Sequence, residues 1–494
     1  MATKTNGAAT ASDTLTTVPV GYVPTPTEAY RSYNINRALT ESPVAGATGT
    51  IPKPTAPKIP TKIPTPLPFQ QGSRVLIWKQ DPTIGEIGVR KTYLPSRLFA
   101  GPRDARIKIE GLPSVAPNIF GDVIVQPADV DAFDAVHTFA VVRQTLTLFE
   151  RTRGGVPLPW QWNGPGNTEP IAVHPHAGVT PNAFYSRTQK ALKFFAFTPQ
   201  AQPNAPVPEQ VFTCRSFDIV AHECGHAILD GLKPGWLTSG NTPQTGGLHE
   251  SFGDIAAMFL ALSQLDQVEA IIAQTKGDLH QKNFLADVAE QFGLALGRPN
   301  GLRNADNDLK LSQVSTEVHA ISQVFTGGIY DAFADIFAFE QRPHLKDDAA
   351  VLYEVGQYLI GLLLRAIIAS PATNAKYADV VNHMMVISAA DGKPQEHRDF
   401  IKNRFVEREV LTTNAVAEEE GAQMFEPAIT DDPGAIQDRS RCCGTMLRAE
   451  YNEDATMYTG YVEDLQRSFD EQGAIFEGRD SEGVVDLSEE KARS

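Results

Sequence analysis

The chain has 494 residues and a formal net charge of −16 at pH 7, and 42% of its residues are apolar. At roughly 150 residues per domain, this length allows two or three domains with sizeable cores. The acidic balance argues against a nucleic-acid partner, because phosphate binding requires clustered Lys and Arg. Four cysteines, none in CxxC spacing, exclude a disulfide scaffold.

The first 72 residues are rich in Thr, Ala and Pro, and the run at 51–68 places a proline every two to four residues. Because proline continues neither a helix nor an inner strand, residues 1–72 are predicted to form an extended arm. Residues 1–20 show no charged start followed by an apolar core, so no secretory signal is expected. The chain is therefore expected to be cytoplasmic, or exported without a cleaved signal peptide.

Residues 73–235 combine strand and helix patterns and are predicted to form a mixed α/β region. Short runs of β-branched and aromatic residues predict strands at 73–78, 122–126, 182–186 and 192–197. Apolar residues at helical spacing predict helices at 133–155 and 216–232.

Residues 236–411 are predicted to be helical, with helices at 249–264, 281–297, 316–340, 346–370, 375–389 and 395–410. The most apolar stretch contains Glu354 and Arg365, so a buried helix is expected there rather than a membrane span. Mixed elements followed by helices predict an α+β fold. From 411 onward the chain carries 20 acidic and 7 basic residues, and 412–494 is predicted to be an acidic tail.

His222, Glu223 and His226 form the motif HExxH within the apolar, helix-periodic stretch 218–232. Two histidines four residues apart lie on one face of a helix, one turn from each other, so both imidazoles can reach one Zn²⁺. Glu223 lies next to the first ligand and can accept a proton from metal-activated water. The alternative is a helix that carries two buried structural histidines.

A third ligand is needed, and the motif HExxHxxGxxH cannot supply it because Leu229 and Leu232 stand where Gly and His are required. Glu250 opens an apolar-periodic run and is the predicted ligand. Asp254, one turn further on, is predicted to accept the spare N–H of a ligating histidine.

Two neighbouring side chains are rivals for the metal. His249 is adjacent to Glu250 and is expected to point elsewhere on the helix. Cys224 lies about 200° around the helix from His222, so it is expected to face away from the metal as a small buried residue.

HExxH on one helix and ExxxD on the next resembles the thermolysin-like gluzincin metallopeptidases, and the resemblance covers roughly residues 120–410. The helix pattern at 128–146, the edge-strand pattern at 181–185 and the segments 301–308 and 317–333 resemble family segments in the same order. The resemblance implies a two-lobed catalytic unit with an N-terminal mixed α/β lobe (73–235), a C-terminal α-helical lobe (236–411) and the active-site helix between them.

The resemblance also implies roles for single residues. His319 would stabilise the oxyanion, and Asn182, Ala183 and Arg303 would bind the substrate. The expected function is that of a zinc-dependent endopeptidase with one catalytic Zn²⁺ and a peptide or protein substrate. The sequence does not indicate an oligomeric state.

The sequence departs from this family in two places. Residues 227–249 contain no Tyr to act as a second oxyanion donor, and the indole N–H of Trp236 is a candidate replacement. The family's acidic cluster is missing from 255–280, although Asp218 is in place, so calcium is not predicted. Two alternatives remain: a zinc-binding inactive scaffold, and a protease effector or toxin delivered by a secretion system.

Overall fold

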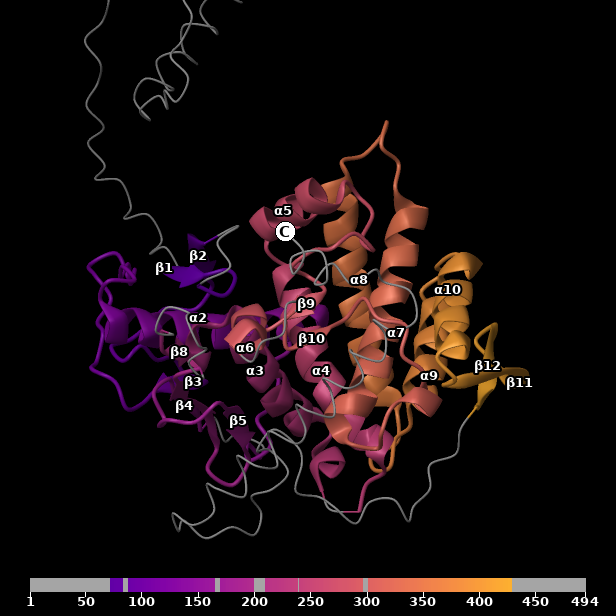
Figure 1. Cartoon of the computed structure of the whole chain (residues 1–494), viewed down its shortest axis with the longest axis horizontal. Helices are drawn as coiled ribbons and strands as arrows, with labels where there is room; N and C mark the ends of the chain where they lie inside the picture. Colours follow the sequence, from indigo (N-terminus) through magenta and orange to yellow (C-terminus); the bar gives the residue numbers. More distant parts are fainter. Residues whose placement is uncertain are drawn as a thin grey trace, which may run out of the picture. The chain divides into compact units, whose positions relative to one another are not determined.

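The computed structural model describes residues 72–82, 88–164, 169–199, 209–238, 240–295 and 301–428, which form a mixed α+β fold of helices and small sheets (Figure 1). All described residues belong to one compact unit, which begins at residue 68. The predicted arm, apart from Gly72, and the predicted tail beyond 428 lie outside the described residues.

The first half of the described chain contains small sheets around a long helix. A four-stranded sheet has the order β3-β4-β6-β5, with β3, β4 and β6 parallel and β5 antiparallel at one edge. Two further antiparallel pairs are β1-β2 and β7-β8. The bounds are β1 Ser73–Trp78, β2 Val89–Leu94, β3 Ile107–Ile109, β4 Ile171–His174, β5 Ala183–Ser186, β6 Ala191–Phe194, β7 Ala196–Phe197 and β8 Val211–Phe212.

Helix α2 (Val130–Thr152) is the hydrophobic centre of this half. Every residue from Phe133 to Phe149 is buried, and the helix packs against β1 and α3. A helix that is buried around its whole circumference belongs in the interior of a domain. Strand β1 and helix α2 were both predicted from the sequence, and both are confirmed within three residues at each end.

Helices α3 (Phe217–Leu232) and α4 (Pro243–Ala261) pack against each other in the middle of the described chain. The hydroxyl of Ser216 accepts from the backbone N–H of Ile219 at the start of α3, as expected for an N-cap serine. Helix α4 begins with Pro243 in its first turn, where a missing N–H costs nothing. The predicted start of this helix was residue 249, so α4 begins six residues earlier than predicted.

The second half is helical. Helix α7 packs on α4 and α10, while α8 packs on α9, α5 and α7 (Figure 1). The bounds are α5 Leu265–Thr275, α6 Glu290–Ala295, α7 Val318–Glu340, α8 Asp348–Ala369, α9 Tyr377–Ala390 and α10 Gln395–Glu407, with a small pair β9 Asp287–Val288 and β10 Arg303–Asn304.

Helix α8 is long and apolar enough to cross a membrane by length and composition, and α4 with α5 would also qualify if the two, bent by 93°, formed one span. In α8, 61% of the most apolar window is buried inside the protein. The buried core helix of a soluble protein can have the same length and apolar composition.

Two predicted elements are wrong. The segment 122–126 is not a strand and makes only an isolated bridge between Val123 and Val75. The predicted helix 281–297 is interrupted, because the side chain of Asn283 accepts from the backbone N–H groups of Leu285 and Ala286, which gives that backbone an alternative to helix bonds. Ala289 then adopts a φ of +53°, which ends any right-handed path before α6.

The predicted boundary of the acidic tail at 412 also needs correction. Strands β11 (Leu411–Glu419) and β12 (Ala422–Pro427) form a hairpin that packs on α9. The side-chain amide of Asn382 exchanges two hydrogen bonds of 2.9 Å with the backbone of Phe425, whose ring is buried. The first residues beyond 411 therefore belong to the helical part of the fold.

Candidate metal centre

Helix α3 carries two imidazoles on one face. His222 and His226 have ring centroids 4.5 Å apart with planes at 87°, and their side chains are buried. This arrangement follows from the four-residue spacing, since positions i and i+4 lie one turn apart.

Helix α4 brings Glu250 to both imidazoles. His222 Nε2 lies 3.5 Å from Glu250 Oε2, and His226 Nε2 lies 3.6 Å from Glu250 Oε1. Ligand atoms at 2.0–2.1 Å around a tetrahedral zinc are separated by about 3.3 Å, so these spacings fit a single ion. Among the described residues, the three side chains form a group that could hold a metal, with ligand atoms within 4.8 Å of one another.

Two glycines allow the helices to approach this closely. A Cβ added to Gly253 would lie 2.5 Å from His222 Nδ1, and a Cβ added to Gly225 would lie 3.1 Å from the Cα of Gly253. Because neither position has a side chain, the ring of His222 fits against the backbone of α4. This contact brings Glu250 and Asp254 within reach of α3.

Asp254 holds the far side of the first imidazole. Its Oδ1 lies 2.9 Å from His222 Nδ1, and because an ionised carboxylate only accepts, the histidine donates and its Nε2 keeps a lone pair. Arg303 makes two hydrogen bonds to the same carboxylate, at 2.8 and 2.6 Å. Burial would raise the pKa of Asp254, but Arg303 and then His222 hold it down to about 2.

This partner of Arg303 was not expected from the sequence. The guanidinium is buried and supports the imidazole of His222 through Asp254. Its predicted contact with a substrate stays a prediction.

The carboxylate of Glu223 is buried beside the metal-ligand group. Its Oε2 is without a hydrogen-bond partner among the described residues. Burial raises the pKa of Glu223 to about 7, although His222 opposes the shift, and a backbone hydrogen bond from Tyr185 on β5 also favours the charged form. A carboxyl group with this pKa can both take up and release a proton near neutral pH.

Burial also acts on Glu250, but with the opposite outcome. Desolvation would raise its pKa, yet the imidazoles of His319, His226 and His222 hold it well below its usual value. Glu250 is therefore an anion, as a metal ligand must be, while its neighbour Glu223 titrates near neutrality.

His319 enters from the first turn of α7. Its Nε2 lies 3.4 Å from Glu250 Oε2, and its Nδ1 lies 2.6 Å from Glu317 Oε1. Glu317 also caps the helix by accepting from the backbone N–H of Ala320. The structure thus brings His319 to the group and gives its ring an anionic partner that the sequence analysis did not identify.

Asn182 and Ala183 lie where β5 begins, at the edge of the four-stranded sheet next to α3. Ala183 pairs with Phe194 on β6, which leaves the opposite edge of β5 without a strand among the described residues. The backbone carbonyl of Asn182 accepts from the hydroxyl of Thr213 at 3.1 Å. Substrate binding at this edge stays a prediction.

Three other expectations can be compared with the structure. Cys224 is fully buried, with its thiol 3.6 Å from the carbonyl of Val142, as expected for a side chain facing away from the metal. The indole N–H of Trp236 donates to the carbonyl of Pro371 at 2.9 Å, so it is already engaged and does not replace the missing tyrosine. His249 is not part of the group that could hold a metal, as expected, but its Nδ1 lies 2.8 Å from the Nδ1 of His226, a contact that the sequence did not predict.

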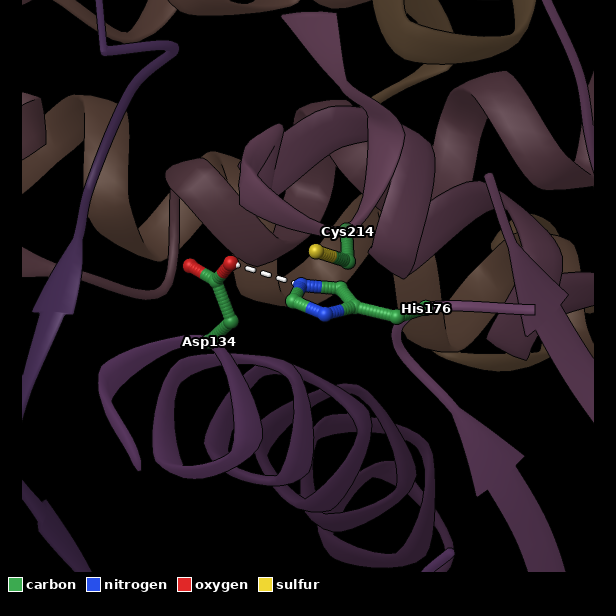
Figure 2. Close-up of side chains that lie close together, drawn as sticks. All are labelled: Asp134, His176 and Cys214. Carbon is green, nitrogen blue, oxygen red and sulfur yellow. Dashed lines mark hydrogen bonds and ion pairs between the residues drawn. The ribbon is translucent and has the colours of Figure 1, made fainter. Parts of the chain in front are cut away.

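A second group with metal-ligand chemistry contains Asp134, His176 and Cys214 (Figure 2). His176 Nε2 lies 2.9 Å from Asp134 Oδ2, and Arg215 donates to both oxygens of that carboxylate at 2.8 to 3.1 Å. Burial raises the pKa of the Cys214 thiol well above its usual value, which disfavours the thiolate that a metal needs. These contacts describe a structural ion pair.

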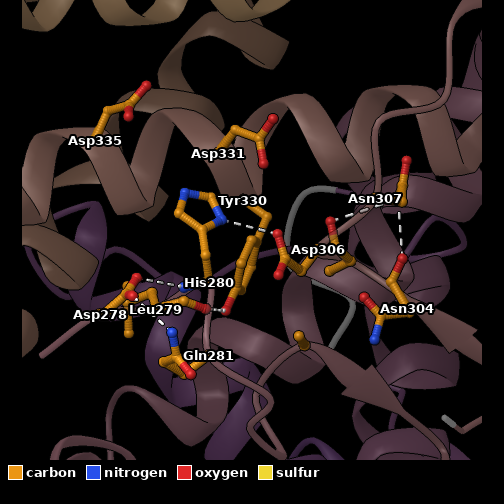
Figure 3. Close-up of polar contacts among 12 residues, drawn as sticks. Asp278, Leu279, His280, Gln281, Asn304, Asp306, Asn307, Tyr330, Asp331 and Asp335 are labelled. Atoms are coloured by element: carbon orange, nitrogen blue, oxygen red, sulfur yellow. Dashed lines mark hydrogen bonds and ion pairs between the residues drawn. The ribbon is translucent and has the colours of Figure 1, made fainter. Parts of the chain in front are cut away.

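A third group contains His280, Asp306 and Asp331 (Figure 3). His280 Nδ1 lies 2.9 Å from Asp306 Oδ1, and that bond raises the pKa of His280 and favours the imidazolium. The carboxylate of Asp331 is paired with Arg408 at 2.7 Å. Since a metal ligand must be a neutral imidazole or a free carboxylate, the group is better explained as a charge network.

The acidic cluster that the sequence lacks at 255–280 is not replaced from that range, but acidic side chains from other segments do surround Asp218. Burial and then Asp81 raise the pKa of Asp218 to about 8, while burial and then Asp81 raise that of Glu290 to about 9. At neutral pH both carboxyl groups are mostly protonated.

No protein-family model matches the sequence, and a comparison with curated proteins finds no match. Among solved structures, the chain is similar to the precursor of protealysin, a metalloproteinase from Serratia proteamaculans, with 12% sequence identity and a TM-score of 0.39. The match covers 70% of this chain and 90% of that chain.

Proposed function

We propose that the chain is a zinc-dependent endopeptidase of the thermolysin-like gluzincin type, with a two-lobed catalytic unit. The observation that carries the proposal is the convergence of His222, His226 and Glu250 from two packed helices, with the buried carboxylate of Glu223 close enough to interact electrostatically with His222 and Glu250. Asp254 supports the first imidazole, and His319 stands next to the third ligand.

The donor set fits zinc. Two imidazole nitrogens and one carboxylate oxygen form the set found in catalytic zinc sites, where three protein ligands leave a fourth position open. Calcium and magnesium prefer sites made of oxygens alone. Zinc held by these residues would supply a Lewis acid that activates water and polarises a carbonyl.

Glu223 would act on the protons of the reaction. Its pKa of about 7 lets it accept a proton from the attacking water and pass that proton to the nitrogen of the leaving amine. The water oxygen forms a bond to the carbonyl carbon, and the C–N bond of the peptide breaks. Burial matters here, because it raises the pKa of a carboxyl group that would otherwise be too weak a base.

The remaining residues would bind and orient the peptide. The open edge of β5, with Asn182 and Ala183 at its start, is suited to pairing with an extended substrate. His319, whose Nδ1 faces the anionic Glu317, can carry a proton on Nε2 and donate it to the developing oxyanion. Arg303 would bind substrate in addition to making its two hydrogen bonds to Asp254.

The test is cleavage of casein and of a quenched peptide by the full chain loaded with zinc. We expect the Glu223→Gln variant to retain one zinc per chain and to lose roughly 10²–10⁴-fold in kcat, the range for loss of a general base. Glu354→Gln, an exposed position on α8, serves as the control and should cleave normally.

Two outcomes would contradict the proposal. Zinc binding without cleavage by the wild type would favour an inactive scaffold. Cleavage that survives in Glu223→Gln at the rate of the wild type would remove Glu223 from the mechanism.

A further inference from the structure

His249 contacts one of the proposed zinc ligands directly. Its Nδ1 lies 2.8 Å from Nδ1 of His226, and the two rings stack with centroids 4.8 Å apart and planes at 27°. Both side chains are fully buried. One comes from α3 and the other from α4, one residue before Glu250.

One hydrogen bond between two ring nitrogens contains one proton, so it has two arrangements. In the first, His226 donates from Nδ1, and its Nε2 keeps a lone pair directed at the position between the ligands. In the second, His249 donates, and a neutral His226 must then carry its hydrogen on Nε2, which faces Glu250 at 3.6 Å. Only the first arrangement lets His226 bind a metal.

The first arrangement defines the state of His249 as well. Its Nδ1 accepts, so its hydrogen is on Nε2, a buried nitrogen that lacks a hydrogen-bond partner among the described residues. An apolar ring of similar size would fill this space equally well. What the imidazole adds is a single acceptor nitrogen aimed at His226.

The two proposed histidine ligands are thus held differently. His222 donates to Asp254, an anion that is itself paired with Arg303. His226 donates to a neutral ring. Partners of this kind set the tautomer and the orientation of a metal-ligating histidine.

We propose that His249 is a positioning residue, which accepts the Nδ1–H of His226 and so directs the Nε2 lone pair of His226 to the metal. This inference rests on the proposed function, since it assumes that His226 is a ligand. It predicts that replacing the acceptor nitrogen weakens metal binding even where the packing is kept.

The experiment compares His249→Phe with His249→Asn in the full chain, using zinc affinity measured by competition with a chromophoric chelator. Phe keeps a ring of similar size but has no acceptor, whereas Asn offers a carbonyl oxygen. We expect zinc affinity to fall about 10–100-fold in His249→Phe, the usual cost of losing such a partner, and to recover most of that loss in His249→Asn. His344→Phe, at an exposed position, is the control and should bind as the wild type does.

A second measurement needs no variant. In zinc-loaded wild type labelled with ¹⁵N-histidine, the Nδ1 of His226 should be protonated and its Nε2 should not, with the reverse for His249. If the wild type binds zinc and His249→Phe binds it equally well, or if the labels show His249 protonated on Nδ1, this inference alone is overturned. A wild type that binds no zinc overturns the proposed function together with it.

Discussion

Gly253 lets the ring of His222 lie directly against the backbone of α4, and its replacement by alanine is the sharpest test of how the helices position the proposed ligands. The added Cβ would lie 2.5, 2.6 and 2.8 Å from three atoms of that ring. Ordinary contacts between such atoms are about 3.5–4.0 Å, so the ring or the helix must move by roughly 1 Å. The ring cannot swing aside freely, because Asp254 holds its Nδ1.

The magnitude follows from two opposing effects. Overpacking of a core costs about 1–3 kcal/mol, while exchange of a helical glycine for alanine contributes about 1 kcal/mol of stability. The net effect on the free energy of unfolding in the absence of zinc is therefore a loss of up to about 2 kcal/mol. Zinc affinity should fall by about 10–100-fold, because the ligand and its support are displaced together.

The assay measures urea unfolding without zinc and chelator competition with zinc, for Gly253→Ala and for Gly361→Ala as the matched control. Gly361 lies in α8, and a Cβ there would meet no atom closer than 3.8 Å, so the control should be slightly more stable than the wild type with unchanged zinc affinity. The reasoning is refuted if Gly253→Ala behaves as Gly361→Ala does in both measurements.

Three further predictions concern stability. Burial lowers the pKa of His137 to about 4, below the unfolded value of 6.5. The stability that the neutral, buried imidazole contributes is therefore complete above about pH 6.5 and is lost as the pH falls toward 4. Between about pH 7 and pH 5, urea unfolding should show the free energy of unfolding dropping by about 2 kcal/mol more in the wild type than in His137→Gln. Arg303→Leu leaves the carboxylate of Asp254 buried without its cation and should cost about 3–5 kcal/mol, and a loss below 1 kcal/mol would show that the pair is not needed. Asn382→Ala removes both bonds to the backbone of Phe425 and should cost about 1–3 kcal/mol and expose the hairpin to limited proteolysis, whereas unchanged protection would contradict its role.

The grouping of the candidate ligand residues could be predicted because the spacing that brings them together is local. His222 and His226 are four residues apart and so lie on one face of a helix. Glu250 and Asp254 have the same spacing on the next apolar helix and also share a face. The structure places these four side chains together. Neither helix pattern states how far apart the two helices lie, and that distance depends on Gly225 and Gly253, whose role is visible only in the packing.

Partners from distant segments could not be predicted. A helical wheel separates His249 from its neighbour Glu250, yet α3 and α4 are close enough for His249 to reach the second nitrogen of His226. The partner of Trp236 is a carbonyl 135 residues away, and no local pattern reveals it. The break before α6 escaped prediction because Asn283 replaces helix bonds with side-chain bonds in an otherwise apolar run.

The most direct measurement of the central claim is a crystal structure of the full chain grown with zinc, with anomalous diffraction recorded on both sides of the zinc absorption edge. The account predicts one strong anomalous peak about 2.0–2.1 Å from His222 Nε2, His226 Nε2 and a carboxylate oxygen of Glu250. No peak between these three side chains, in crystals of a chain that binds zinc in solution, would contradict it.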